Sequence, residues 1–262
     1  QRQSIPFGAM NSTIFATPTT LPFGSMQTIS NSPILVVAPH PDDETLGCGG
    51  AIARLRQLDC DVHVLVISDG TQSHPHSRQY PPPALRALRE SETISGVASL
   101  GVAAECVTFL QLPDGAVPAL STAAGQRARI RCSLYLESVM PSVIFLPWRY
   151  DPHPDHRASW QLLRAALSDF PLQPRLIEYP IWDWDPQQRG SMPLPDRFHV
   201  WRLDISAVLR KKRSAIAAYR SQTTSLIADD PTGFRLSSEM LTHFTQPWEI
   251  YLEEMAKIPS DQ

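Results

Sequence analysis

Short apolar runs alternate with helical segments from residue 33 onward, and this alternation is the clearest pattern in the chain. Most of these runs are continuous, which is typical of strands covered on both faces of a parallel sheet. The predicted strands are 34–38, 62–67, 106–110, 143–146, 176–179 and 198–203. The predicted helices are 46–58, 84–100, 126–140, 155–169, 207–219 and most of 236–256. The pattern predicts an α/β fold, a doubly wound, mostly parallel Rossmann-like sheet flanked by helices.

The first 31 residues differ from the rest of the chain. They are rich in Ser, Thr, Pro, Gln and Gly and show no sustained hydrophobic period. Because such a segment offers little apolar surface to bury, residues 1–31 are predicted to be a flexible extension that is loosely docked or disordered. Residues 32–262 are predicted to form a single domain.

Composition and charge exclude several classes of function. The 262 residues carry a net charge of −3, so no general attraction to nucleic acid or to an anionic membrane is expected. No apolar run reaches the roughly 18 residues of a membrane span, and no secretory signal is visible. The four cysteines form no CxxC pair, which argues against a thiolate zinc site or a disulfide framework. We therefore expect a cytoplasmic protein, and the sequence leaves a homo-oligomer open.

Polar residues follow four consecutive predicted strands, at the point where each strand ends. The segments are His40-Pro-Asp-Asp-Glu44, Ser68-Asp-Gly70, Pro113-Asp-Gly115 and Asp151-Pro-His-Pro-Asp-His156. In an open α/β sheet, ligands bind in the crevice at the carboxyl ends of the strands. The four segments therefore bring His and Asp side chains to one rim.

The first and last of these segments contain the donor atoms of a metal site. Imidazole nitrogen and carboxylate oxygen suit a zinc-like ion, and ligands spaced i and i+3 can point to one side of a turn. Three protein ligands leave a fourth position for water, whose pKa the metal lowers to about 7. Asp42 is then a candidate general base, and His153 can stabilise an oxyanion or protonate a leaving amine. For either segment alone, turn or helix-cap chemistry is the alternative.

These segments resemble the two signature motifs of the PIG-L/LmbE-like deacetylases, a zinc-dependent family that includes N-acetylglucosaminyl deacetylases. The resemblance extends over about residues 33–222. The matching stretches are Ala38–Gly50, Arg89-x-x-Glu92, Leu112-Pro-Asp-Gly115, His153-Pro-Asp-His156 and Tyr219-x-Ser-Gln222.

The resemblance implies roles for individual residues. One zinc ion would be held by His40, Asp43 and His156. Asp42 would be the base and His153 the oxyanion or acid partner, with Asp155 orienting His153. Substrate contacts are expected from Asp69, Arg89 and Asp114.

The expected activity is hydrolysis of the N-acetyl amide of an N-acetylglucosamine-type sugar or glycoconjugate, releasing acetate and a free amine. An amidase acting on a larger acyl group, and a carbohydrate-binding protein without activity, are the alternatives. The expected partner is this small-molecule substrate.

Several residues have a structural alternative. Arg89 and Glu92 can form a surface ion pair, and Asp69 can close an Asx turn. Loop 71–83, with its His74-Pro-His76, is expected to be solvent-exposed or a lid rather than a metal ligand. The glycines after Leu46 are unlike a nucleotide-binding motif, because they lack the GxGxxG spacing and a Walker lysine. The Trp182-Asp-Trp184 segment is either core or a wall on which a sugar stacks.

Overall fold

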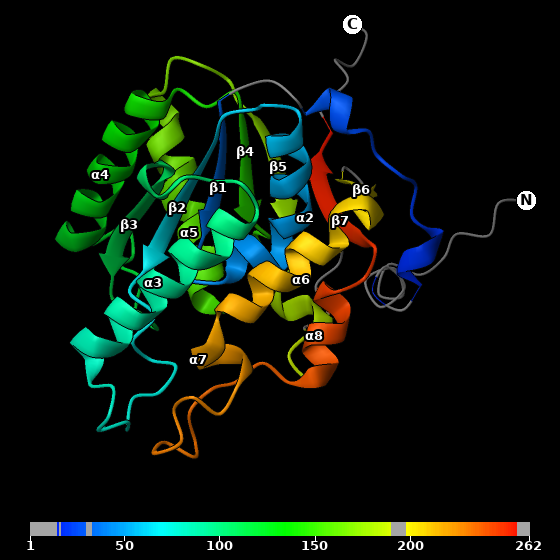
Figure 1. Cartoon of the computed structure of the whole chain (residues 1–262). Helices are drawn as coiled ribbons and strands as arrows, with labels where there is room; N and C mark the ends of the chain where they lie inside the picture. The colour runs from blue at the N-terminus through cyan, green and yellow to red at the C-terminus, as the bar shows by residue number, and fades with distance from the viewer. Residues whose placement is uncertain (1–14, 16, 30–32, 190–197, 256–262) are drawn as a thin grey trace, which may run out of the picture.

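The computed structural model describes residue 15 and residues 17–29, 33–189 and 198–255, and these form one seven-stranded sheet (Figure 1). The strand order is β3-β2-β1-β4-β5-β7-β6. The parallel strands are β1 (Ile34–Ala38), β2 (Val62–Ser68), β3 (Val107–Leu112), β4 (Val143–Pro147) and β5 (Arg175–Tyr179). The strand β7 (Trp248–Glu254) lies between β5 and β6 (Phe198–Asp204) and is antiparallel to both. The sheet confirms the predicted α/β fold class.

Helices cover both faces of the sheet. On one face lie α2 (Asp43–Gln57), α3 (Pro82–Ser99) and α6 (Leu209–Ala218), and on the other lie α4 (Ala123–Val139) and α5 (Pro154–Ala166). The short helices α7 (Arg220–Thr223) and α8 (Ser238–Phe244) follow α6. Alternate residues of β1 belong to two separate hydrophobic clusters, which explains its continuous apolar run. In the described part of the chain, no helix is both long and apolar enough to cross a membrane.

The prediction of a mostly helical segment over 236–256 is wrong. Within the described residues 236–255, only α8 is helical, and the seven residues of β7 pair with β6 along their whole length. The glutamates of this segment favour a helix by propensity, but long-range partners stabilise the strand. Glu249 lies 2.7 Å from Lys212 Nζ, and Glu253 lies 2.8 Å from Arg175 Nε.

Residues 17–29 pack along β6. Gly24 N donates to Arg202 O at 2.7 Å, and Arg202 N donates to Pro22 O at 2.8 Å. Met26 and Ile29 are buried in the core. This part of the predicted extension is therefore docked rather than loose. Residues 1–14, 16 and 30–31 lie outside the described residues, and the division at residue 31 stays a prediction.

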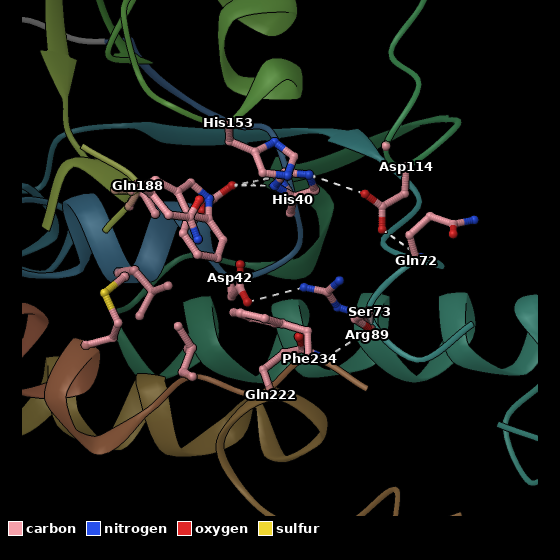
Figure 2. Close-up of a pocket in the computed structure, with 17 residues that line it drawn as sticks. His40, Asp42, Gln72, Ser73, Arg89, Asp114, His153, Gln188, Gln222 and Phe234 are labelled. Carbon is pink, nitrogen blue, oxygen red and sulfur yellow. Dashed lines mark hydrogen bonds and ion pairs between the residues drawn. The ribbon is translucent and has the colours of Figure 1, made fainter. Parts of the chain in front are cut away.

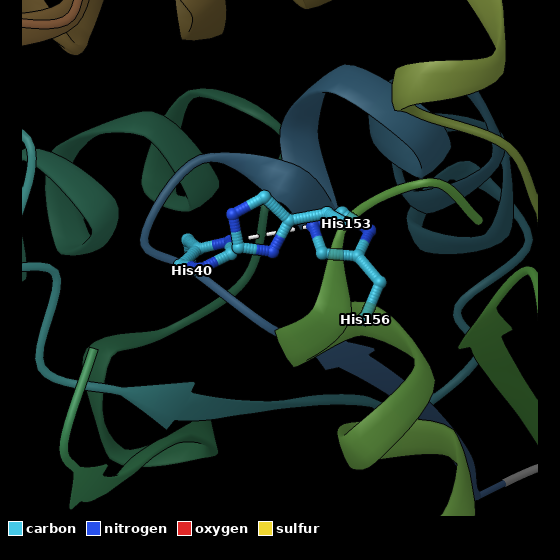
Figure 3. Close-up of side chains that lie close together, drawn as sticks. All are labelled: His40, His153 and His156. Carbon is cyan, nitrogen blue, oxygen red and sulfur yellow. Dashed lines mark hydrogen bonds between the residues drawn. The ribbon is translucent and has the colours of Figure 1, made fainter. Parts of the chain in front are cut away.

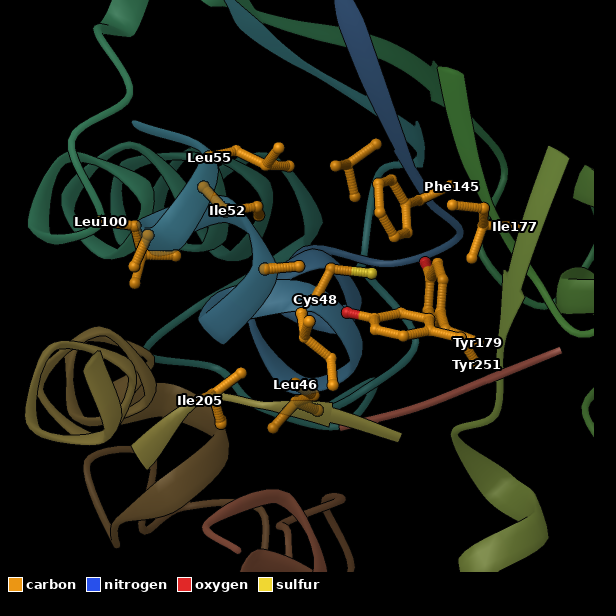
Figure 4. Packing of buried hydrophobic residues seen from close by; sticks show 14 of the residues in the cluster. Leu46, Cys48, Ile52, Leu55, Leu100, Phe145, Ile177, Tyr179, Ile205 and Tyr251 are labelled. Carbon is orange, nitrogen blue, oxygen red and sulfur yellow. The ribbon is translucent and has the colours of Figure 1, made fainter. Parts of the chain in front are cut away.

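Glycines in α2 allow this helix to lie close to the sheet. A Cβ at Gly47 would come within 2.2 Å of the Tyr179 ring, and one at Gly50 within 2.5 Å of Ile205. Figure 4 shows Cys48 of α2 beside the rings of Tyr179 and Tyr251, in the hydrophobic core between this helix and the sheet. The glycine run therefore serves packing within a helix and forms no phosphate-binding turn.

Candidate active site

The loops after β1 and β4 bring three predicted ligands together. Asp43 Oδ2 lies 3.1 Å from His40 Nδ1 and 3.2 Å from His156 Nε2, and these two nitrogens are 3.3 Å apart. His40 follows β1 directly, Asp43 begins α2, and His156 lies in the first turn of α5. Figure 3 shows the two histidines meeting from these separate elements, with His153 beside them.

The spacing of the three atoms fits a metal ion. Zinc ligands at about 2.0–2.1 Å from a tetrahedral ion are separated from one another by roughly 3.3 Å. The observed separations of 3.1, 3.2 and 3.3 Å agree with this value. The donor types also suit zinc, because imidazole nitrogen and carboxylate oxygen are common ligands of such divalent ions. This His and Asp group can therefore hold a metal ion.

Carboxylates face the outer nitrogen of each of these two histidines. His40 Nε2 lies 3.3 Å from both Asp155 Oδ2 and Asp114 Oδ1, and His156 Nδ1 lies 3.4 Å from Asp151 Oδ2. The last contact is an electrostatic pairing, since its geometry does not qualify as a hydrogen bond. Carboxylates in this position fix the histidine tautomer and orient the ring toward a metal. The inner nitrogens are thereby left to act as ligands.

Asp151 is a residue of this site to which the sequence assigned no role. Its buried carboxylate accepts hydrogen bonds from the backbone N–H groups of His153, Ile181 and Trp182, at 2.9, 3.2 and 3.1 Å. It thus joins the loop after β4 to the loop after β5. Burial lowers the pKa of His156, but Asp151 and Asp43 outweigh burial and raise that pKa to about 9. The signal in the sequence was its position at the start of the fourth strand-end segment.

The side chain of Asp155 contacts His40 and not His153, contrary to the expectation that it orients His153. Its carboxylate accepts from Gly115 N at 2.7 Å and Val117 N at 3.2 Å. His153 is the N-cap of α5, and its Nδ1 accepts from the backbone N–H of Asp155 at 3.2 Å. Because the backbone N–H of Asp155, and not its carboxylate, binds the capping ring of His153, the Asp155 side chain is free to turn toward the loop after β3.

Asp42 lies beside the metal ligands with a strained backbone. Its φ of 141° is rare for a residue other than glycine. Glu44 Oε2 accepts from Asp42 N at 3.2 Å, and Arg89 Nη2 donates to Asp42 Oδ2 at 3.2 Å. Burial raises the pKa of Asp42 to about 8, although Arg89 acts in the opposite direction. A buried carboxyl group with such a pKa is suited to accept a proton near neutral pH.

Arg89 is buried and borders the cavity, and it forms no surface ion pair with Glu92. Besides Asp42, its guanidinium donates to Gly70 O at 3.0 Å and to Pro41 O at 2.7 Å. Glu92 instead accepts from the backbone and hydroxyl of Ser221. The packing of α3 against α6 buries this side of α3, so the surface alternative is wrong.

The other two expected substrate contacts lie in different surroundings. Asp114 borders the cavity, and although burial raises its pKa, His40 outweighs burial and lowers that pKa to about 2. Asp69 is not among the residues that line the cavity. Its Oδ1 accepts from Thr71 N at 3.2 Å, Thr71 Oγ1 at 2.8 Å and Asp114 N at 3.4 Å, which favours the alternative of a structural turn.

A cavity of about 260 Å³ lies over the candidate metal ligands (Figure 2). Its polar lining includes His40, Asp42, Asp114 and His153. Its apolar lining consists of Leu46, Ile181, Trp182, Phe234, Leu236 and Met240. The Trp182 ring stacks on His153 with centroids 5.8 Å apart, whereas Trp184 is buried in the core. Only the first tryptophan of the Trp182-Asp-Trp184 segment thus borders the cavity.

Loop 71–83 is fixed to residues 229–234 rather than exposed along its length. Asp229 accepts from Ser77 Oγ and the backbone N–H groups of Arg78 and Gln79, at 2.7–2.9 Å. His74 is buried, and its ring packs beside Gly233. Among the described residues, it belongs to no group of His, Cys, Asp or Glu side chains that could hold a metal ion. His76 is exposed. The loop therefore brings Gln72 and Ser73 to the cavity wall.

Comparisons with known proteins agree with this geometry. The family model described as GlcNAc-PI de-N-acetylase (PIG-L) matches residues 35–167. A 1D-myo-inositol 2-acetamido-2-deoxy-alpha-D-glucopyranoside deacetylase of Rhodococcus opacus is 25% identical, over 81% of this chain and 88% of the relative.

Two solved structures share the fold. The N,N'-diacetylchitobiose deacetylase of Pyrococcus horikoshii has a TM-score of 0.60 at 20% identity and covers 86% of this chain and 84% of its own. GalB, the 4-carboxy-2-hydroxymuconate hydratase of Pseudomonas putida, has a TM-score of 0.60 at 18% identity and covers 87% of this chain and 98% of its own. Because these two proteins have different activities, structural likeness at this identity establishes the fold alone.

Proposed function

This chain belongs to the PIG-L family of de-N-acetylases, and we propose that it hydrolyses the N-acetyl amide of an N-acetylglucosamine-type sugar or glycoconjugate, releasing acetate and an amine. One observation carries the proposal. A triad of His40 Nδ1, Asp43 Oδ2 and His156 Nε2 is spaced 3.1–3.3 Å apart, and His40 and Asp43 line one cavity together with the buried carboxyl group of Asp42.

His40, Asp43 and His156 would hold one zinc ion in this proposal. A bound zinc ion supplies Lewis-acid polarisation of the amide carbonyl and lowers the pKa of water. Asp114, Asp151 and Asp155 orient the two histidines through their outer nitrogens. These contacts support roles in positioning for all three carboxylates.

Asp42 is proposed to accept the proton of the attacking water on a carboxylate oxygen. Its separation from the triad is limited by chain connectivity, because it directly precedes Asp43. Arg89 also fixes this segment, because its guanidinium donates hydrogen bonds to Pro41 O and Asp42 Oδ2. A pKa raised to about 8 by burial makes the carboxylate a stronger base than a solvated one.

His153 is proposed to stabilise the oxyanion by donating a hydrogen bond. Burial, aided by the charges of His40 and His156, lowers the pKa of His153 to about 4, so its imidazole is neutral near neutral pH. The nitrogen Nδ1 accepts from Asp155 N, which leaves the proton on Nε2. A neutral ring with a proton on Nε2 favours hydrogen-bond donation over the alternative role of general acid.

The test is acetate release from N-acetylglucosamine, N,N'-diacetylchitobiose and N-acetylglucosaminyl-inositol by zinc-loaded protein. We expect stoichiometric acetate and amine from at least one of them. The same sugars with longer acyl groups separate a de-N-acetylase from the amidase alternative. Binding of these sugars without hydrolysis of any acyl derivative would refute the proposal in favour of a non-catalytic carbohydrate-binding protein.

A further inference from the structure

Gln222 has a buried acceptor atom without a partner at the cavity. The side chain is fully buried and borders the cavity, on the side of Phe234 and across from His40 and His153 in Figure 2. Its Nε2 donates to Ser221 Oγ at 2.9 Å and to Ser73 Oγ at 3.3 Å. Among the described residues, its Oε1 has no hydrogen-bond partner.

The surrounding hydrogen bonds determine which end of the Gln222 amide is unpaired. Ser221 Oγ donates its only proton to Glu92 Oε2 at 2.6 Å, and Ser73 Oγ donates to Gly70 O at 3.4 Å. Ser221 Oγ can therefore only accept from Gln222. A flipped amide would direct Oε1 at a lone pair of Ser221 Oγ, 2.9 Å from the amide, so the unpaired atom is the carbonyl oxygen.

The same cavity has an unpaired donor. Arg89 Nε is buried and has no partner among the described residues, while both terminal nitrogens of this guanidinium are occupied. Buried polar atoms that lack partners are costly and need an explanation such as a ligand. An acceptor and a donor in one cavity match a polyhydroxylated ligand, because each hydroxyl group can both donate and accept.

We propose that Gln222 Oε1 accepts a hydrogen bond from a ring hydroxyl group of the substrate, which makes Gln222 a specificity-determining residue. This inference rests on the proposed function, because it assumes a sugar in this cavity. A phosphate or carboxylate at the same position would present lone pairs to Oε1 and would be rejected. The substrate class is therefore a sugar with a free hydroxyl at this position, rather than its deoxy, phosphorylated or carboxylated counterpart.

The test is a double-mutant cycle that combines Gln222→Met with monodeoxy analogues of the best substrate. Methionine has a similar length and removes the amide. We expect Gln222→Met to lower kcat/KM for the parent sugar about tenfold, the effect of one buried hydrogen bond. One monodeoxy analogue should show a similar loss with the wild-type protein and no further loss with Gln222→Met. Gln126→Met, at an exposed position of α4, is the control and should match the wild type.

Two results would overturn the inference. The first is that the wild-type protein has the same kcat/KM for the parent sugar and for all monodeoxy analogues. This result needs no variant, so it remains decisive if the Gln222→Met protein fails to fold. A uniform loss across all analogues with Gln222→Met would indicate a purely structural role. If the wild-type protein releases no acetate, the proposed function fails, and calorimetric binding of the parent and deoxy sugars still tests the hydrogen bond. Equal affinities in that assay would overturn the inference separately.

Discussion

Replacing Asp151 with Asn should weaken metal binding although this residue is not a ligand. The Asp151 carboxylate accepts from three backbone N–H groups and faces His156 Nδ1 at 3.4 Å. An asparagine amide has one acceptor oxygen. In either orientation its NH₂ group would therefore oppose at least one buried N–H donor.

The size of the effect follows from these contacts. One unpaired buried N–H costs about 1–3 kcal/mol of folding free energy. Loss of a carboxylate behind a metal-ligating histidine typically lowers metal affinity 10–100-fold, which corresponds to about 1.4–2.8 kcal/mol. We therefore expect Asp151→Asn to raise the dissociation constant for zinc by this factor and to lower the melting temperature.

The measurement is competition with a chromophoric chelator, performed in a Cys106→Ser background. This background is needed because donor atoms of Asp61, His63 and Cys106 lie within 4.8 Å of one another and can bind added metal. Asp169→Asn is the matched control, since Asp169 pairs with Arg129 at an exposed position. If the Asp151→Asn variant has the same zinc affinity as the control, the reasoning is refuted. That result would show that the Asp151 carboxylate does not strengthen metal binding by His156.

Three further predictions concern the same site and its support. Asp42→Asn should keep its zinc, measured by elemental analysis, but lose about 10²–10⁴-fold in kcat for acetate release, and a smaller loss would exclude it as the base. Zinc affinity should rise with pH below about pH 9, by up to about tenfold per pH unit for each histidine that loses a proton, because the pKa of His156 is raised to about 9 in the metal-free protein and that of His40 is also raised. A flat chelator titration between about pH 6 and pH 8 would contradict this sign. Gly47→Ala should lower the free energy of unfolding by about 1–3 kcal/mol through overlap with the Tyr179 ring, and an unchanged denaturant midpoint would show that the helix can shift.

Short motifs at strand ends predicted that His40, Asp43 and His156 lie together, and the resemblance to the deacetylase family supplied their expected role as metal ligands. His40 and Asp43 are three residues apart in one turn, and His156 lies at a second strand end of the same parallel sheet. The rule that strand ends meet at one edge places such segments together without knowledge of side-chain packing. The positions of β1 and β4 could be predicted because both strands are continuous apolar runs that are buried along their whole length.

Long-range packing decided what the spacing of residues in the sequence could not. The strand β7 pairs with both β5 and β6, and its Glu249 forms an ion pair with Lys212, so these long-range contacts outweigh the helical propensity of the segment. The Asp155 side chain contacts His40, 115 residues away, since its backbone N–H and not its carboxylate binds the His153 ring that caps α5.

The positions of Gln222 and Phe234 in the cavity lining depend even more on tertiary structure. Gln222 and Phe234 reach the cavity only because the chain after α6 folds back over the strand ends, where hydrogen bonds such as Phe234 N to Ser73 O fix it. The sequence by itself determined the chemistry of the site, because that chemistry lies in short motifs at strand ends. Tertiary structure decided which atoms remain unpaired and therefore what the site can bind, because pairing depends on contacts between distant segments.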